Sequence, residues 1–338
     1  MKPVSGAGPG GAPLLGDVGE DGLVRAVLGR YRPPPPFLLV PAGDDAAVLE
    51  VPGRVVVSTD TLVEGADFRR DWSGGHPVGV KLAAQNLADV AAMGARPLAL
   101  VASLAAPASL PLDWATALAD GLDDETARAG AAVAGGDVSQ ADRLVLTGTA
   151  LGVLEGPPVL RSGARPGDVV ALAGRTGPSA AGLALLLAAG SPAAAAGLAP
   201  SASALVEAHL APRPSYAAGP DAARAGATAL IDVSDGLLRD ARRVAVASDV
   251  VLDLEPAALA PPADLVTAAK ALGGRDLALE WVLTGGEDHA LLACFPPDAG
   301  LPAPFDVVGR VLPAHDGPGV LVGGTPWAGP DGWHHFSR

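Results

Sequence analysis

The sequence predicts two domains, each built from alternating strands and helices of the α/β or α+β class. The chain has 338 residues, the length of roughly two typical domains. Apolar residues make up 49% of the chain and charged residues 18%, so large hydrophobic cores can form and a disordered chain is not expected. Short β-branched or leucine-rich runs alternate with helical periodicity in both halves, which is the pattern of mixed α/β folds.

Charge and hydropathy exclude several functional classes. Acidic residues outnumber basic ones by 37 to 23, so a partner nucleic acid or anionic membrane surface, which needs a basic face, is not expected. The longest charge-free stretch, residues 176–206, is interrupted by prolines and glycines, which disfavours a membrane span. The only cysteine, Cys294, lies in an apolar run and is expected to be buried, in keeping with a cytoplasmic protein.

One pattern recurs along the chain: a strand-like apolar run is followed by a small-residue turn that carries Asp or Glu. The strand–turn pairs are residues 37–40 with 43–45, 55–57 with 58–61, 131–134 with 135–137, 229–231 with 232–236, and 281–283 with 284–288. Acids that directly follow strands lie where α/β proteins commonly build binding sites.

Helices are predicted from the spacing of apolar residues. They cover residues 19–31, 80–93, 113–129, 177–189 and 202–210, and the segment that follows residue 236 as far as 247. In the second of these, Asp89 shares a polar face with Lys81 and Gln85, so it is expected to point away from the core. A turn-rich joint at residues 155–158 separates a first domain (19–155) from a second domain (156–338). Residues 1–18 are expected to form a flexible tail.

The acidic turns favour magnesium chemistry. An isolated Asp in a Gly/Ser turn is most often a turn former or a helix N-cap, so the argument depends on recurrence beside hydroxyl groups. The acids concerned are Asp45, Asp60, Asp89, Asp137, Asp232 and Asp235. Converging carboxylates repel and raise one another's pKa, and Mg²⁺ removes this conflict by binding carboxylates and substrate phosphates together. The sequence therefore favours Mg²⁺ over Zn²⁺ and phosphoryl transfer as the reaction class.

Motifs spread over nearly the whole chain resemble the thiamine-monophosphate kinase family. They are GDDAAV (43–48), STDTLVEG (58–65), KLAAQNLADVAAMGARP (81–97), GGDVS (135–139), LRSGARPGD (160–168), IDVSDGLLRD (231–240) and LTGGEDHALL (283–292). The resemblance implies the two-domain fold of the aminoimidazole ribonucleotide synthetase superfamily. In that fold an N-terminal α/β domain dimerises through its sheet, a C-terminal α+β domain follows, and ATP binds in the cleft between them.

The resemblance also implies an activity and a set of site residues. A homodimer would transfer the γ-phosphoryl group of ATP, the co-substrate, directly and in line to thiamine monophosphate, with several Mg²⁺ ions. The implied metal ligands are Asp45, Ser58, Thr59, Asp60, Asp89, Asp137, Asp232 and Asp235, and Asp60, Asp89, Asp137 and Asp232 among them would carry catalysis. The implied ATP contacts are Gly136, Asp137, Arg161 and Ser234, and the implied substrate contacts are Glu287 and Trp333.

One position departs from the family pattern. The family usually has a His-Phe pair after the STDTLVEG segment, in which the histidine contacts the substrate, whereas this chain has Asp67-Phe68. An ionised Asp67 cannot donate a hydrogen bond, but a carboxylate favours a cationic thiamine ring, so we expect it to contact the substrate in a different way. No general base is expected, because a phosphate monoester is already ionised near neutrality.

Two other functions remain open from the sequence. One is another ATP-dependent enzyme of the same superfamily. Selenophosphate synthetases normally need a reactive Cys or selenocysteine near the N-terminus, whereas the only cysteine here is Cys294. The other is a non-catalytic thiamine or nucleotide sensor, suggested by Asp67, although retention of every metal-ligand position argues against lost catalysis.

Overall fold

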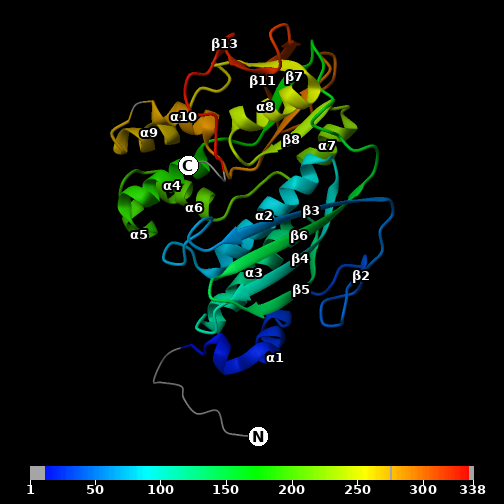
Figure 1. Cartoon of the computed structure of the whole chain (residues 1–338), viewed down its shortest axis with the longest axis vertical. Coiled ribbons are helices and arrows are strands. Elements are labelled where there is room, and N and C mark those ends of the chain that lie inside the picture. Colours follow the sequence, from blue (N-terminus) through cyan, green and yellow to red (C-terminus); the bar gives the residue numbers. More distant parts are fainter. Residues whose placement is uncertain (1–11, 275, 335–338) are drawn as a thin grey trace, which may run out of the picture. The chain divides into compact units, whose positions relative to one another are not determined.

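The computed structural model describes residues 12–274 and 276–334 (Figure 1). These residues divide into two compact units. The first holds those up to Leu87 together with Pro97–Leu151, and the second holds Ala88–Arg96 together with those from Gly152 onward. The sequence placed this division at residues 155/156 and assigned 88–96 to the first domain. None of the helices in the described ranges combines the length and the apolar character needed to cross a bilayer.

The first unit is organised around a four-stranded sheet with the strand order β3-β6-β4-β5, in which β4 and β5 are parallel. Its elements are α1 (Leu15–Leu28), β1 (Leu38–Val40), β2 (Val48–Leu49), β3 (Arg54–Val63), α2 (Gly75–Ala92), β4 (Arg96–Ala106), α3 (Leu112–Arg128), β5 (Ala132–Gln140) and β6 (Val145–Leu154). The last residues of α2 and of β6, and the first residue of β4, are counted with the second unit. Part of the predicted flexible tail is helical, because α1 begins at Leu15, and residues 1–11 lie outside the described part.

Two predicted turns are instead the continuation of strands. Residues 58–61 belong to β3, where Thr59 Oγ1 donates to the Gly148 carbonyl oxygen at 2.8 Å and the hydroxyls of Thr61 and Thr147 lie 3.1 Å apart. β-Branched residues with cross-strand hydroxyl partners favour extended backbone, which explains why the strand does not stop. Residues 135–137 belong to β5, where a Cβ at Gly136 would lie 2.0 Å from the Ala102 carbonyl oxygen. The glycine therefore allows β5 to lie this close to β4.

α2 is buried on its polar face as well as on its apolar one. Lys81 is 2% exposed, Gln85 7% and Asn86 0%, so the polar side of the helix on which Asp89 was expected to point away from the core is itself largely buried. Lys81 Nζ donates to the Asp67 carbonyl oxygen at 3.2 Å, which satisfies a charge that burial would otherwise penalise. Asp89 on the same face is only half-buried.

The second unit is organised around a seven-stranded sheet with the order β13-β12-β9-β11-β7-β10-β8. Its elements are β7 (Val169–Ala173), α4 (Pro178–Ala189), α5 (Pro192–Ala195), α6 (Ala202–Leu210), α7 (Ala218–Arg224), β8 (Ala229–Val233), α8 (Leu237–Ser248), β9 (Val250–Leu254), α9 (Ala263–Ala271), α10 (Leu277–Thr284), β10 (Ala290–Phe295), β11 (Phe305–Pro313), β12 (Gly319–Val322) and β13 (Thr325–Pro326). β10 lies antiparallel between β7 and β8, and β11 lies antiparallel between β7 and β9.

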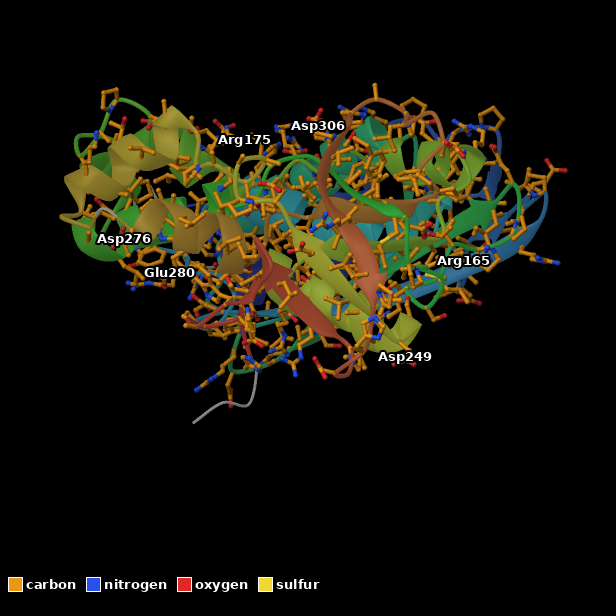
Figure 2. All side chains as sticks on the ribbon, turned by 90° about the horizontal axis from the view of Figure 1, so that it is seen from above. Arg165, Arg175, Asp249, Asp276, Glu280 and Asp306 are labelled. Carbon is orange, nitrogen blue, oxygen red and sulfur yellow. The ribbon has the colours of Figure 1, made fainter. Side chains whose placement is uncertain are left out.

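The predicted strand at residues 281–283 is wrong, because it lies within α10. Ala278, Trp281 and Val282 are buried together, and this i, i+3, i+4 spacing is that of one helical face. A run of three apolar residues does not distinguish a strand from a buried helix. Charged side chains such as Arg165 and Asp249 lie at the exterior of this unit (Figure 2).

Glycines allow helices to approach each other closely in each unit. In the first, a Cβ at Gly79 on α2 would lie 2.2 Å from the Leu118 carbonyl oxygen on α3. In the second, a Cβ at Gly182 on α4 would lie 2.1 Å from the Leu205 carbonyl oxygen and 3.0 Å from His209 Cβ, both on α6. The α4–α6 contact therefore places His209 at a defined position.

Gly79→Ala is expected to lower the free energy of unfolding by about 1–3 kcal/mol, because the added methyl group overlaps backbone and outweighs the helix propensity of alanine. Gly74→Ala is the matched control, since its Cβ would meet nothing within 4 Å, and it should stay within about 0.5 kcal/mol of wild type. Equilibrium denaturation measures both. Equal stabilities of the two variants would contradict the close approach of α2 and α3.

Candidate active site

The predicted metal ligands of the first unit lie on two strands and one loop. Ser58, Thr59 and Asp60 lie on β3, and Asp137 lies on β5. Asp45 lies in the connection between β1 and β2. Asp45, Asp60 and Asp137 are exposed, so a ligand can reach their carboxylates.

The strand order separates the two acidic strands. β3 and β5 are the opposite edges of the sheet, with β6 and β4 between them. At roughly 4.8 Å per strand, the edge strands β3 and β5 lie about 14 Å apart, too far for Asp60 and Asp137 of one chain to bind one ion with both carboxylates. In the part of the chain that the structure describes, no group of three or more His, Cys, Asp or Glu side chains is arranged to hold a metal ion.

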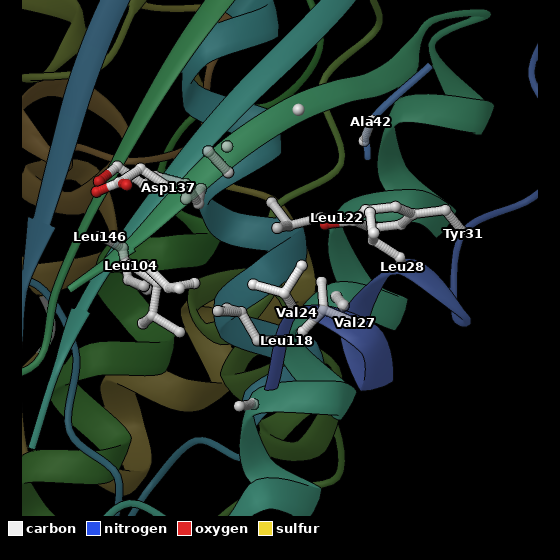
Figure 3. Close-up of a pocket in the computed structure, with 18 residues that line it drawn as sticks. Val24, Val27, Leu28, Tyr31, Ala42, Leu104, Leu118, Leu122, Asp137 and Leu146 are labelled. Carbon is white, nitrogen blue, oxygen red and sulfur yellow. The ribbon is translucent and has the colours of Figure 1, made fainter. Parts of the chain in front are cut away.

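A mainly apolar pocket of about 100 Å³ lies beside the Gly136-Asp137 segment of the first unit (Figure 3). α1, α3, β4 and β5 contribute most of its lining, which includes Val24, Leu28, Leu118, Leu122, Leu104 and Val138. Figure 3 shows Asp137 at one end and Tyr31 at the other. Burial, with a smaller contribution from the charge of Asp123, raises the pKa of Tyr31 to about 12, so its phenol stays neutral.

Asp67 has a structural contact in addition to its predicted role toward the substrate. Its Oδ2 accepts a hydrogen bond from the Val63 backbone N–H at 2.8 Å, which closes the turn after β3. The residue is half-buried. The carboxylate therefore has a defined place in this turn.

The turn after β8 is organised by an acidic side chain that follows it. Asp240 on α8 accepts hydrogen bonds from the backbone N–H groups of Ser234 and Asp235, each at 3.0 Å. Asp235 in turn is paired with Arg243 at 2.5 Å and with Arg239 at 3.3 Å. The two arginines neutralise Asp235, so a metal ion would compete with them for this carboxylate.

Negative charge is concentrated around this turn. Asp240 is fully buried, and burial followed by the charge of Asp232 raises its pKa to about 7, although Arg243 opposes the shift. Asp232 is itself buried on β8. Carboxylates so close together favour a bound cation.

The same turn brings together three of the predicted ligand contacts. The Glu287 backbone N–H donates to the Ser234 carbonyl oxygen at 2.8 Å, and the Trp333 N–H donates to the Asp235 carbonyl oxygen at 2.8 Å. Trp333 is 61% exposed. Backbone hydrogen bonds thus hold a predicted ATP contact, Ser234, next to both predicted substrate contacts.

Arg161, another predicted ATP contact, lies in the loop before β7, beside the beginning of β8. Its neighbour Leu160 accepts a hydrogen bond from the Leu230 N–H at the beginning of the strand, whereas Ser234 follows the strand's end. Four residues of extended chain separate Leu230 from Ser234, about 13 Å. The exposed side chain of Arg161 would have to span most of that distance to share a ligand with Ser234.

A buried histidine links two predicted metal ligands. His289 Nδ1 lies 3.3 Å from Asp232 Oδ2. Burial lowers the pKa of His289, but the hydrogen bond and charge of Asp232, with the charges of Glu287 and Asp89, outweigh it and raise the pKa overall. Asp89 and Asp232 therefore act on one imidazole within the second unit.

Asp288, between Glu287 and His289, caps a helix. Its two carboxylate oxygens accept hydrogen bonds from the N–H groups of Gly177, at 2.6 Å, and Ser179, at 2.8 Å, at the beginning of α4. Burial nevertheless raises the pKa of Asp288 to about 7. Glu287 and His289 both have positive φ angles, 64° and 53°, which directs three consecutive side chains to three different partners.

Sequence reasoning missed Asp240, Asp288, His209 and His289. Asp240 ends the IDVSDGLLRD motif, and Asp288 and His289 lie within LTGGEDHALL, so their places inside these motifs were the available signal. His209 lies in an apolar, alanine-rich segment, and nothing in the spacing of its neighbours marked it out.

Comparisons with known proteins place this geometry in a family. Residues 43–154 match the family model of the AIR synthase related protein, N-terminal domain. The thiamine-monophosphate kinase of Mycobacterium tuberculosis is 48% identical over 97% of this chain and 94% of its own length. This chain belongs to the thiamine-monophosphate kinase family. The family resemblance of the motifs is thereby confirmed.

Solved structures of thiamine-monophosphate kinases have the same fold. The enzyme from Stenotrophomonas maltophilia matches with a TM-score of 0.76 and 32% identity, covering 90% of this chain and 95% of that one. AaThiL complexed with AMPPCP and TMP matches with a TM-score of 0.74 and 30% identity, covering 95% and 98%. The predicted fold class is confirmed by these likenesses.

The raised pKa of Asp288 predicts a pH dependence of stability in this thiamine-monophosphate kinase family member. Between the ordinary value of 3.8 and about 7, the folded state holds a proton that the unfolded state has lost, so this contribution to stability falls as pH rises. In Asp288→Asn, position 288 does not titrate. Between pH 5 and 7 the unfolding free energy of this variant should therefore fall less steeply than that of wild type, and the two slopes should differ by up to about 1.4 kcal/mol per pH unit.

Urea denaturation at several pH values provides the comparison. Asp298→Asn, at an exposed position, is the control and should follow the wild-type slope. Parallel curves for wild type and Asp288→Asn would show that this carboxyl group does not retain its proton on folding.

Proposed function

We propose that this chain transfers the γ-phosphoryl group of ATP to thiamine monophosphate, giving ADP and thiamine diphosphate. The observation that carries the proposal is the 48% identity, over 97% of the chain, to a thiamine-monophosphate kinase. The likeness to AaThiL complexed with AMPPCP and TMP supports the same pair of substrates.

The pocket beside Gly136 and Asp137 is suited to the adenine ring of ATP. Its lining is mainly apolar and its far end carries the neutral phenol of Tyr31, and flat heteroaromatic rings favour such surroundings. An adenine ring there would direct the phosphates toward the carboxylate of Asp137. Gly136 and Asp137, the predicted ATP contacts of the first unit, would then lie beside the phosphates.

The donor set suits Mg²⁺. Asp45, Asp60, Asp89, Asp137 and Asp232 would supply carboxylates, and Ser58 and Thr59 hydroxyls, which are the hard oxygen ligands that this ion prefers. Burial, and then the charge of Asp232, raises the pKa of Asp240, so the Asp232 carboxylate acts on the turn after β8. When bound, the ions would supply electrostatic stabilisation of the phosphates. Asp235 would contribute only in competition with Arg239 and Arg243.

The protein's own residues would orient the two substrates. Ser234 would contact ATP, with Arg161 approaching from the other end of β8. Glu287 would attract the cationic part of thiamine monophosphate, and the exposed ring of Trp333 would stack on it. Since the attacking phosphate is already ionised near neutrality, the residues would contribute positioning and electrostatics and no proton transfer.

We further propose a homodimer in which β3 of one copy meets β5 of the other. The separation of Asp60 from Asp137 within one chain supports this, because the opposite edges of two copies would bring these acids together. Val55 and Val57 on the edge strand β3 are 46% and 62% exposed, and exposed apolar edges favour pairing with another chain.

The proposed activity is tested with purified protein, ATP, Mg²⁺ and thiamine monophosphate, with thiamine diphosphate as the readout. Formation of thiamine diphosphate in step with ADP is expected. ADP formation with another acceptor only would indicate a different enzyme of the superfamily. Binding of thiamine monophosphate without turnover would indicate a sensor.

Asp60→Asn is expected to lower kcat by at least about a hundredfold, because it removes a charged oxygen that would face Mg²⁺ and phosphate. Its melting temperature should stay close to wild type, since the residue is exposed. Asp142→Asn, an exposed acid before β6, is the control and should retain full activity. A wild-type kcat for Asp60→Asn at saturating Mg²⁺ would remove Asp60 from the site.

The dimer makes a separate prediction about mixtures of variants. Asp60→Asn and Asp137→Asn should each be inactive alone, yet mixing and reassembling them should restore about a quarter of wild-type activity, because half of the dimers would be mixed and each would hold one intact site. No recovery in a mixture shown to have exchanged subunits would place both acids in a site within one chain.

A further inference from the structure

A buried histidine connects Glu287 to the interior of the second unit. His209, in the last turn of α6, is 6% exposed. Its Nδ1 lies 3.3 Å from Glu287 Oε2 and 3.1 Å from Ser179 Oγ. The Glu287 side chain is 35% exposed, so its carboxylate is accessible to a ligand while it contacts the imidazole.

The contact between Glu287 and His209 depends on a proton at Nδ1. An ionised carboxylate only accepts hydrogen bonds, so attraction between Glu287 and Nδ1 requires a proton on Nδ1. Ser179 Oγ lies at hydrogen-bonding distance from the same nitrogen. A charge-assisted contact of this kind is strengthened by its buried surroundings.

The surrounding backbone leaves both partners little freedom to move. Gly182 holds α4 against α6, with the Leu205 carbonyl oxygen 2.1 Å from where a Cβ would lie. The Glu287 backbone is tied to Ser234 by a 2.8 Å hydrogen bond. The remaining freedom of Glu287 lies in its side-chain torsions, and the contact with His209 restricts these.

We propose that His209 is a positioning residue that orients the Glu287 carboxylate toward the cationic part of thiamine monophosphate. This rests on the proposed function, in which Glu287 contacts that substrate. His209 acts through Glu287 and touches neither ATP nor the transferred phosphoryl group. Its loss therefore affects KM for thiamine monophosphate, and leaves kcat and KM for ATP nearly unchanged.

A matched pair of substitutions tests this proposal. In His209→Asn the amide takes approximately the place of Nδ1, whereas in His209→Gln it takes approximately that of Nε2. We expect His209→Gln to raise KM for thiamine monophosphate about tenfold, the effect of losing one charge-assisted hydrogen bond. His209→Asn should stay within about threefold of wild type.

A double-mutant cycle and a spectroscopic measurement complete the test. In the Glu287→Gln background, His209→Gln should cause no further rise in KM. In ¹⁵N NMR spectra of the otherwise wild-type protein, Glu287→Gln should shift the Nδ1 resonance of His209, a readout that needs no folded His209 variant. Equal KM values for the two His209 variants, additive effects in the cycle, or an unshifted resonance would each overturn the proposal.

The outcomes also separate this proposal from the proposed function. A wild-type protein that forms no thiamine diphosphate overturns the proposed function and this inference with it. Wild-type turnover with an unchanged KM in His209→Gln overturns only the positioning role.

Discussion

Repulsion between carboxylates and phosphates is the physical constraint on which the proposed site depends. The chain carries a formal net charge of −14, and the substrates proposed for it are themselves anionic at their phosphates. Around the turn after β8, Asp232, Asp235 and Asp240 lie close enough for burial and mutual charge to raise the pKa of Asp240 to about 7. Arg239 and Arg243 neutralise part of this charge, and Mg²⁺ is the cation that we propose for the phosphates and the remaining carboxylates.

The positions of the residues that we propose as ligand contacts in the second unit are set largely by backbone hydrogen bonds. Segments far apart in the sequence meet at Ser234 and Asp235, whose carbonyl oxygens accept the N–H groups of Glu287 and Trp333. Side chains add further contacts to this backbone. Asp288, for example, accepts hydrogen bonds from the Gly177 and Ser179 N–H groups and so holds its own turn against the beginning of α4. These backbone contacts explain how an exposed residue such as Trp333, a proposed substrate contact, keeps a defined place.

The parts of the fold with strong local signals were predictable. α6 has the bounds expected from its apolar spacing, and α8 covers Leu237–Ser248, where a helix after residue 236 as far as 247 was expected. Local signals failed where tertiary contacts decide: Thr59 continues a strand because β6 offers hydroxyl and carbonyl partners, and residues 281–283 are helical because Ala278 shares their buried face. The motifs led to the family and to candidate acids. They did not reveal His209, because its contact with Glu287 joins α6 to a distant turn whose geometry depends on two positive φ angles.

The most direct test of the central role of charge is the affinity for AMPPCP measured by calorimetry, with Mg²⁺ and with a chelator. Neutralisation by divalent cations predicts that AMPPCP binds at least about tenfold more weakly when Mg²⁺ is removed. Equal affinities under the two conditions would show that the acidic residues do not meet the phosphates through metal ions, and would contradict this account of the site.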